Sequence, residues 1–407
     1  MASNIMRLRA PQGIQKASRS LLRIACAVPL LAAASLSASP QAGKASVKGT
    51  SQSTAVADVR RPRDPRDRIA LRTFGRKVRE LQGLLGNTGL SVAIVKDQQL
   101  LWAGGYGSAN LETRAAATKD TPYAIASVTK PVAATLLLQL VEKGVVSLGE
   151  PARRYSPAFT DDSIRIRHLL THSSEGTPGE KYAYNGDRFR ELTQVIEKAS
   201  GVPFRQVLAQ GVLDRLDMSR SVPGHDVLDD REMPIGILSP DTLARYRGTL
   251  ADLAKPYTVA SGRAQLSDYP PRGLNAAAGL ITTAVDLANF DVALDRQVLL
   301  KQETIDKAWT PATSRAGHAL PYGLGWFVQR HQGMKLVWHY GYWQQFSALY
   351  LKVPEKNLTL IVMANSNGLS APFGLGDSDV LASPFACGFL RSFTSGNTRN
   401  RAVAAAS

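Results

Sequence analysis

A serine and a lysine three residues apart are the side chains of this chain best placed to do chemistry together. On a helix, Ser127 and Lys130 would share a face, because positions i and i+3 are neighbours there. A serine hydroxyl is a poor nucleophile until a nearby group takes its proton, and a lysine that burial keeps uncharged can do this. The spacing therefore predicts nucleophilic catalysis. A solvated helix start with a surface lysine is the alternative that two residues alone leave open.

The residues after this pair predict the helix that would position it. Leu136, Leu137 and Leu140 recur at helical spacing, and Gly144 ends the pattern. Pro131 falls in the first turn, where its missing N–H costs least. A second amphipathic helix is predicted over residues 69–86.

Predicted strands occur near both ends of the chain. Residues 91–95 and 100–103 predict a β-hairpin, and four further strands are predicted at 325–328, 336–339, 348–351 and 358–363. The residues between, roughly 128–310, predict mainly helices and loops. This order predicts one sheet built from both ends of the chain, with a helical insertion between them.

The basic charge is concentrated in the first 82 residues. The formal net charge is +16, yet residues 1–82 hold 16 Lys and Arg against 4 Asp and Glu, so only +4 is left for the rest. Residues 1–38 combine basic residues, an apolar stretch at 24–36 and small residues before Pro40, which is typical of a signal peptide. An uncleaved helix resting on a membrane is the alternative for this leader. Residues 39–67 predict a basic disordered linker.

Two classes of partner are not expected for the main domain. The modest charge after residue 82 gives no support for nucleic-acid binding. No run of 18 or more apolar residues occurs, so no transmembrane segment is expected once the leader is removed. The basic linker could make a weak contact with an anionic envelope surface, but a solvated spacer is the favoured interpretation.

Seven segments in order carry a resemblance to a known family. They are residues 91–107, 126–130, 167–173, 178–184, 278–288, 322–326 and 339–341. Together they resemble the serine β-lactamase and penicillin-binding-protein superfamily, nearest its class C-like branch of β-lactamases, esterases and D-aminopeptidases. The S-x-x-K pattern that begins at Ser127 is part of that superfamily's signature.

The resemblance implies an α+β fold. An antiparallel sheet would be flanked by N- and C-terminal helices, with an inserted, mainly helical lobe and a cleft between the two. The domain would span residues 68–395, with the sheet lobe from 68–122 and about 310–395 and the helical lobe from about 123–309. Residues 396–407 would form a flexible tail.

The resemblance also implies catalytic roles. Ser127 would attack a carbonyl to form an acyl-enzyme, and Lys130 would accept its proton. In the family's Tyr-x-Asn motif, Tyr184 matches the tyrosine that assists proton transfer to the leaving group. Gly186 occupies the asparagine position, which is a departure from the family. Asn185, one residue earlier, is the candidate for the missing amide.

The third family motif falls at residues 339–341. Gly341 would let substrate lie against the backbone, and the backbone N–H groups of Ser127 and Tyr342 would form an oxyanion hole. His339 stands where many relatives have a lysine, and a histidine with a pKa near 6.5 is mostly neutral at pH 7. Loss of that cation would weaken binding of an anionic β-lactam by about 1.5–3 kcal/mol.

Neither a metal nor a cofactor is expected. His168 and His172 have the i, i+4 spacing of a helical zinc pair, but Leu169 stands where H-E-x-x-H has its glutamate. Hydrogen-bonded structural histidines are therefore favoured. The glycines at 104–107 are not followed by a dinucleotide or phosphate-loop pattern.

These observations predict an exported serine hydrolase, periplasmic or secreted, that acts on an ester, amide or D-peptide bond of a small-molecule or peptide substrate. A β-lactamase or D,D-peptidase proper is one alternative. A non-catalytic member of the fold that binds peptidoglycan or peptides is another, and Gly186 is the feature that favours it. The sequence does not specify the oligomeric state.

Overall fold

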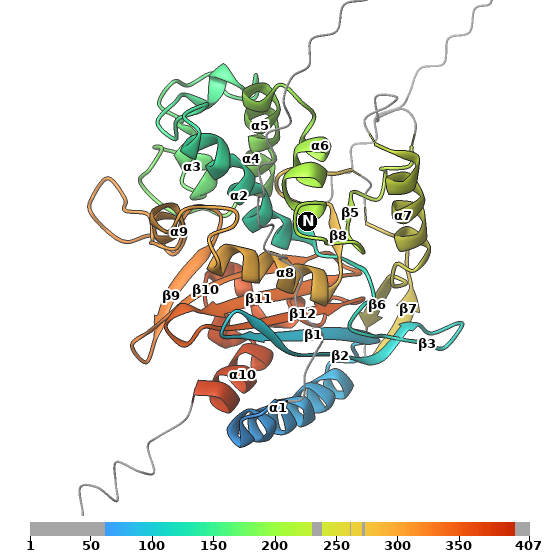
Figure 1. Ribbon diagram of the computed structural model, residues 1–407. Helices are drawn as coiled ribbons and strands as arrows, with labels where there is room; N and C mark the ends of the chain where they lie inside the picture. Colours follow the sequence, from blue (N-terminus) through green and yellow to red (C-terminus); the bar gives the residue numbers. More distant parts are fainter. Residues whose placement is uncertain (1–61, 230–237, 261, 271–272, 395–407) are drawn as a thin grey trace, which may run out of the picture. The chain divides into compact units, whose positions relative to one another are not determined.

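A seven-stranded antiparallel sheet organises the part of the chain that the structure describes (Figure 1). The structure is a computed structural model that describes residues 62–229, 238–260, 262–270 and 273–394. The predicted signal peptide, most of the predicted linker and the predicted tail lie outside these residues. In spatial order the strands are β3 (Ala115–Ala116), β2 (Gln99–Asn110), β1 (Gly89–Lys96), β12 (Leu358–Ala364), β11 (Ser347–Val353), β10 (Met334–Tyr342) and β9 (Phe327–His331).

Strands from the two ends of the chain meet in the middle of this sheet. β1 pairs with β2, as the predicted hairpin requires, and also with β12, where Leu90 lies opposite Ala364. Both β1 and β12 are buried along nearly their whole length, because helices cover both faces of the sheet. The predicted α+β class and the closure of the sheet by both termini are confirmed. The strand predicted from residue 325 begins two residues later, at Phe327.

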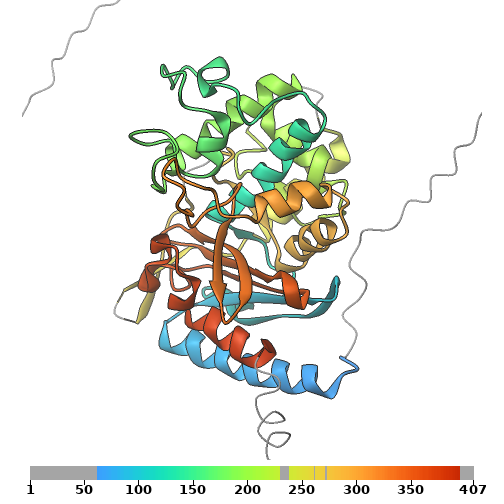
Figure 2. The same cartoon turned by 90° about the vertical axis from the view of Figure 1, so that its left-hand side faces the viewer.

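Helices α1 (Pro65–Leu84) and α10 (Pro384–Thr394) cover one face of the sheet (Figures 1 and 2). Phe74 of α1 packs edge to face against Phe389 of α10, and both are buried. Burying an aromatic or aliphatic side chain of this size contributes about 1.5–3 kcal/mol. The side chain of Asp64 caps α1, so the helix starts inside the predicted linker. The last residues of the linker prediction are therefore wrong.

Helices α2 (Thr129–Glu142) and α8 (Ala284–Asp295) belong to the core on the opposite face. α8 is tied to β11 by a buried ion pair between Lys352 Nζ and Asp291 Oδ1, 2.6 Å apart. The sequence analysis assigned residues up to about 309 to the helical lobe. This assignment is wrong for α8, which packs on the sheet.

The remaining helices form the region on the far side of α2 and α8 from the sheet (Figures 1 and 2). A short three-stranded sheet lies at its base, in the order β4 (Tyr123–Ala124), β8 (Leu280–Thr282) and β5 (Val222–Pro223). Among the described residues, no helix combines the length and the apolar character needed to cross a membrane. The helices of this far-side region are α3 (Ile166–Leu170), α4 (Gly186–Arg190), α5 (Leu192–Ser200), α6 (Phe204–Leu208), α7 (Pro240–Ala251) and α9 (Gln302–Ala308). A separate hairpin consists of β6 (Tyr257–Ala260) and β7 (Arg263–Leu266).

Candidate active site

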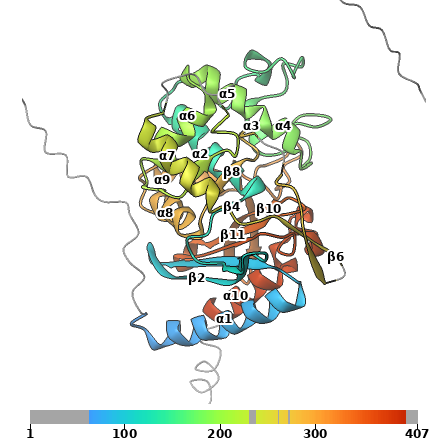
Figure 3. The ribbon, with the colours of Figure 1, turned by 90° about the vertical axis from the view of Figure 1, so that its right-hand side faces the viewer.

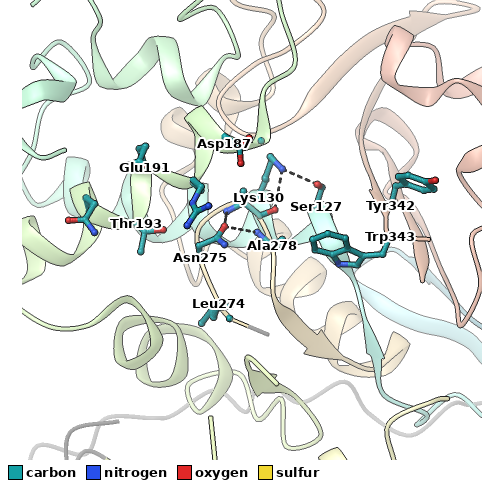
Figure 4. Close-up of a pocket in the computed structure, with 15 residues that line it drawn as sticks. Ser127, Lys130, Asp187, Glu191, Thr193, Leu274, Asn275, Ala278, Tyr342 and Trp343 are labelled. Carbon is teal, nitrogen blue, oxygen red and sulfur yellow. Dashed lines mark hydrogen bonds between the residues drawn. The ribbon is translucent and has the colours of Figure 1, made fainter. Parts of the chain in front are cut away.

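Ser127 and Lys130 lie together where a short turn of 3-10 helix, Ala126–Val128, runs into α2. The lysine Nζ is 2.9 Å from the serine Oγ, so the predicted proximity of the two groups is confirmed (Figure 4). The carbonyl oxygen of Ala277 accepts a second hydrogen bond from the same Nζ, at 3.1 Å. The amine is therefore held at a fixed position beside the hydroxyl.

The amine of Lys130 is poised to be uncharged. Lys130 is only 1% exposed, and burial lowers the pKa of its amine from 10.5 to about 7. The carboxylate of Asp187 partly opposes this shift. A lysine near this value is neutral in a large fraction of molecules at pH 7 and can accept a proton. This is the electrostatic condition that the sequence prediction required.

The backbone before the nucleophile is held in an unusual conformation. Ala126 has φ +46°, in the left-handed region that a side chain with Cβ seldom adopts, at a cost of about 1–3 kcal/mol. Three contacts hold this turn. Ile125 N–H donates to the Leu280 carbonyl at 3.1 Å, the Thr129 hydroxyl donates to the Ala126 carbonyl at 2.7 Å, and Leu280 N–H donates to that hydroxyl at 3.2 Å.

Gly341 supports the same turn, and its role differs from the one expected. A Cβ at this position would lie 2.1 Å from the carbonyl oxygen of Ile125, so only glycine lets β10 approach the turn that carries Ser127. The expectation that Gly341 makes room for substrate is therefore corrected, because the space above its Cα is occupied by the protein's own backbone.

Tyr184 lies beside the reacting pair. Its ring is partly buried, with Lys130 Nζ 5.0 Å from the ring centroid. Burial raises the pKa of its hydroxyl well above 10, the neighbouring Tyr340 adds to this shift, and the Ser127 hydroxyl opposes it. The hydroxyl itself has no hydrogen-bond partner of good geometry among the described residues. It is a protonated donor close to the nucleophile.

The structure does not bring Asn185 into the site. Its side-chain oxygen accepts from Arg188 N–H at 2.9 Å and so caps α4, and its amide nitrogen donates to Glu175. Asn185 therefore does not replace the missing amide of the family motif. Gly186 itself lines the pocket, and a Cβ there would be 4.0 Å from Lys130 Nζ. The space beside the amine is open.

His339 is buried behind the site instead of lining it. Its Nδ1 donates to the Tyr340 carbonyl at 2.7 Å, and Nε2 then accepts from the Tyr322 hydroxyl at 2.8 Å. Burial lowers the pKa of His339 well below 6.5, and the nearby Lys130 adds to this shift. These contacts support the expected neutral state of the His339 ring. The expected contact with substrate is corrected, because both ring nitrogens are engaged and the residue is 0% exposed.

A pocket of about 610 Å³ opens above Ser127. Figure 4 shows Ser127 and Lys130 in the middle, with Tyr342 and Trp343 at the end of β10 on one side. Polar residues from α4, α5 and the 273–278 segment line the other side. Sequence reasoning missed these residues, because only the packing of α4 and α5 beside α2 brings them to the nucleophile. They are Asp187, Arg190, Glu191, Thr193, Gln194 and Asn275.

The two histidines with zinc-like spacing act as hydrogen-bond acceptors. Nδ1 of His168 accepts from the backbone N–H of Arg165, and Nδ1 of His172 accepts from that of Asn185, each at 3.1 Å. Burial lowers the pKa of His168 to about 4 and that of His172 well below 6.5. Both are neutral: His168 fixes the start of α3, and His172 fixes the backbone next to Tyr184.

Comparisons with known proteins agree with this architecture. A model of the family described as Beta-lactamase matches residues 74–381. Penicillin-binding protein 4* of Bacillus subtilis (strain 168) is 22% identical over 314 residues, covering 68% of this chain and 67% of that protein. The putative penicillin-binding protein PbpX of the same organism is 24% identical over 261 residues, covering 58% of this chain and 61% of that protein.

A solved structure shares the fold. The octameric penicillin-binding protein homologue from Pyrococcus abyssi superposes with a TM-score of 0.65 at 23% identity, covering 79% of this chain and 77% of that one. The match thus spans about three fifths to two thirds of the curated relatives and about three quarters of this structural neighbour.

Proposed function

This chain belongs to the Beta-lactamase family, and from that premise we propose that it is a serine hydrolase that works through an acyl-enzyme intermediate. The observation that carries the proposal is the buried Lys130 amine, with a pKa of about 7, at 2.9 Å from the Ser127 hydroxyl. Burying a lysine amine in this way destabilises the folded state. A role as proton acceptor in catalysis accounts for its presence.

In the proposed reaction, Ser127 Oγ attacks the substrate carbonyl carbon while its proton passes to Lys130 Nζ. The negative charge on the carbonyl oxygen is stabilised by the backbone N–H groups of Ser127 and Tyr342. The bond to the leaving group then breaks, and Tyr184 donates a proton to the departing atom and recovers one from Lys130. Water attacks the acyl ester by the same route in reverse, which releases the acid and restores the serine.

Esters, amides and D-peptides are the proposed substrates, in preference to anionic β-lactams. His339 is neutral and buried, so it supplies no cation to a substrate carboxylate. Arg190 is the cationic candidate among the residues that line the pocket, and it is flanked along the chain by Asp187 and Glu191. A substrate carboxylate would meet these acidic side chains as well.

Covalent labelling tests the catalytic proposal. A fluorescent fluorophosphonate should label the wild-type chain, fail to label Ser127→Ala, and label the matched variant Ser163→Ala, which changes an exposed serine away from the pocket. If wild type stays unlabelled while a reference serine hydrolase in the same tube reacts, the non-catalytic alternative favoured by Gly186 replaces the proposal.

A substrate pair tests the preference. Short-chain nitrophenyl esters should be turned over with a higher kcat/KM than nitrocefin. Faster turnover of nitrocefin would instead favour the β-lactamase or D,D-peptidase alternative and would contradict the argument from His339.

We also propose that the chain is exported to the periplasm or secreted, on the basis of the basic, apolar and small-residue order of residues 1–38. N-terminal sequencing of the protein recovered from fractionated cells tests this. A protein that keeps its first residues and stays in the cytoplasmic fraction would contradict it.

A further inference from the structure

The outer side of α1 carries unneutralised positive charge. The helix holds six basic and two acidic residues. Both acidic residues are already paired, Asp67 with Lys96 at 2.7 Å and Glu80 with Lys77 at 2.9 Å. Three arginines at i, i+4 and i+7 are exposed, and none of them forms an ion pair with any residue that the structure describes; they are Arg72, Arg76 and Arg79.

The basic excess of residues 1–82 is not confined to the predicted leader and linker. Six of these basic residues lie on α1, which begins before the helix predicted over residues 69–86 and so includes Arg66 and Arg68 as well. A folded helix fixes their spacing and their direction, so they act as one surface and not as independent charges on a flexible chain.

These arginines border a groove of about 590 Å³ between α1 and β2. Gly75 creates part of it, since a Cβ there would stand 3.2 Å from the Tyr106 hydroxyl, which packs against the helix. The guanidinium of Arg79 lies 5.7 Å from the centroid of the Tyr106 ring. Apolar side chains complete the lining, and Ile69 among them is 57% exposed. The groove is therefore cationic at its border and apolar inside.

We propose that this face of α1 docks the protein on an anionic phospholipid membrane, with the three arginines at the lipid phosphates and Ile69 among the acyl chains. Each basic residue near such a surface attracts anionic lipid, and an exposed aliphatic residue beside it gains from leaving water. A soluble anion would use the arginines but would gain nothing from Ile69. The combination therefore favours a membrane over a free phosphate.

The position of α1 agrees with this use. It lies on the face of the sheet opposite α2, and Ser127 sits in the turn that leads into α2, so a docked α1 does not cover the pocket (Figure 3). This docking is independent of the proposed hydrolysis, and either can fail without the other.

Vesicle flotation with the full chain tests the proposal. The wild type should float with vesicles of equal phosphatidylglycerol and phosphatidylcholine, release at high salt, and not float with phosphatidylcholine alone. The variant R72Q/R76Q/R79Q should bind about a hundredfold more weakly, since each charge is worth about a fivefold change in partitioning. The matched variant R167Q/R247Q/K307Q removes three exposed cations from other elements and should float like the wild type.

Two further measurements decide the outcome. Ile69→Ser removes the apolar side chain without adding charge, so it should weaken flotation and leave binding to inorganic polyphosphate unchanged. Equal urea midpoints and equal ester hydrolysis in solution show that the variants are folded. The proposal is overturned if the two triple variants float equally. It is also overturned if Ile69→Ser floats like the wild type while the α1 triple variant alone loses polyphosphate binding, which would identify a site for soluble anions.

Discussion

Replacing Lys130 by methionine should make the protein more stable and almost inactive. In the folded state burial lowers the pKa of this amine to about 7, whereas an unfolded chain restores its ordinary value of 10.5. Between these values the unfolded state binds more protons, so the stability of the wild type rises with pH in this window. The buried amine then destabilises the wild type by about 4 kcal/mol at pH 7 and by about 2 kcal/mol at pH 9.

Methionine has a similar length and carries no charge, so it removes this penalty. It also loses the hydrogen bonds to Ser127 and to the Ala277 carbonyl, worth about 1 kcal/mol each. Lys130→Met should therefore exceed the wild type by about 2 kcal/mol at pH 7 and nearly equal it at pH 9. Its kcat/KM should fall by about 10²- to 10⁴-fold, the usual contribution of a general base.

Urea denaturation at pH 7, 8 and 9 measures the difference, and Lys352→Met is the matched control. Lys352 is equally buried, and burial alone would lower its pKa, but Asp291 and Asp295 raise it overall. Its removal leaves a carboxylate buried without its cation, so that variant should lose about 3–5 kcal/mol at every pH tested. If the gap between wild type and Lys130→Met stays constant from pH 7 to 9, the amine is not neutral near pH 7 and the proposed base is refuted.

Three other substitutions test the site. Tyr184→Phe should lower kcat about 10²-fold yet leave the urea midpoint unchanged, since its hydroxyl lacks a partner among the described residues; a lost midpoint would indicate a structural role. Asp187→Asn should move the acid limb of kcat/KM to lower pH, because its carboxylate raises the pKa of Lys130; an unmoved limb would exclude that coupling. Gly341→Ala should lower the free energy of unfolding by about 3 kcal/mol or more and slow fluorophosphonate labelling, because its Cβ would meet backbone. The control Gly248→Ala, in open space on α7, should raise that free energy by up to about 1 kcal/mol. Equal behaviour of the two variants would contradict the close approach of β10 to the turn.

Local patterns in the sequence were sufficient to predict the elements and the reacting pair. The i, i+3 spacing alone puts the side chains of Ser127 and Lys130 on one face, and the apolar runs predict the strands at both ends of the chain. These inferences depend on neighbours along the chain, which the sequence states directly.

The surroundings of the pair depend on contacts between distant segments, and there the predictions failed or were missing. The neutral amine of Lys130 needs burial by the rest of the fold. Gly341 faces a carbonyl more than two hundred positions earlier, and His339 accepts a hydrogen bond from Tyr322. Asn185 is the exception, because its capping of α4 is a local contact that the sequence analysis missed. The amino-acid sequence by itself thus determined which groups could react, because their proximity follows from local helix geometry. Only the tertiary structure decided their charge, their partners and their access to solvent, because those are set by residues that folding alone brings near.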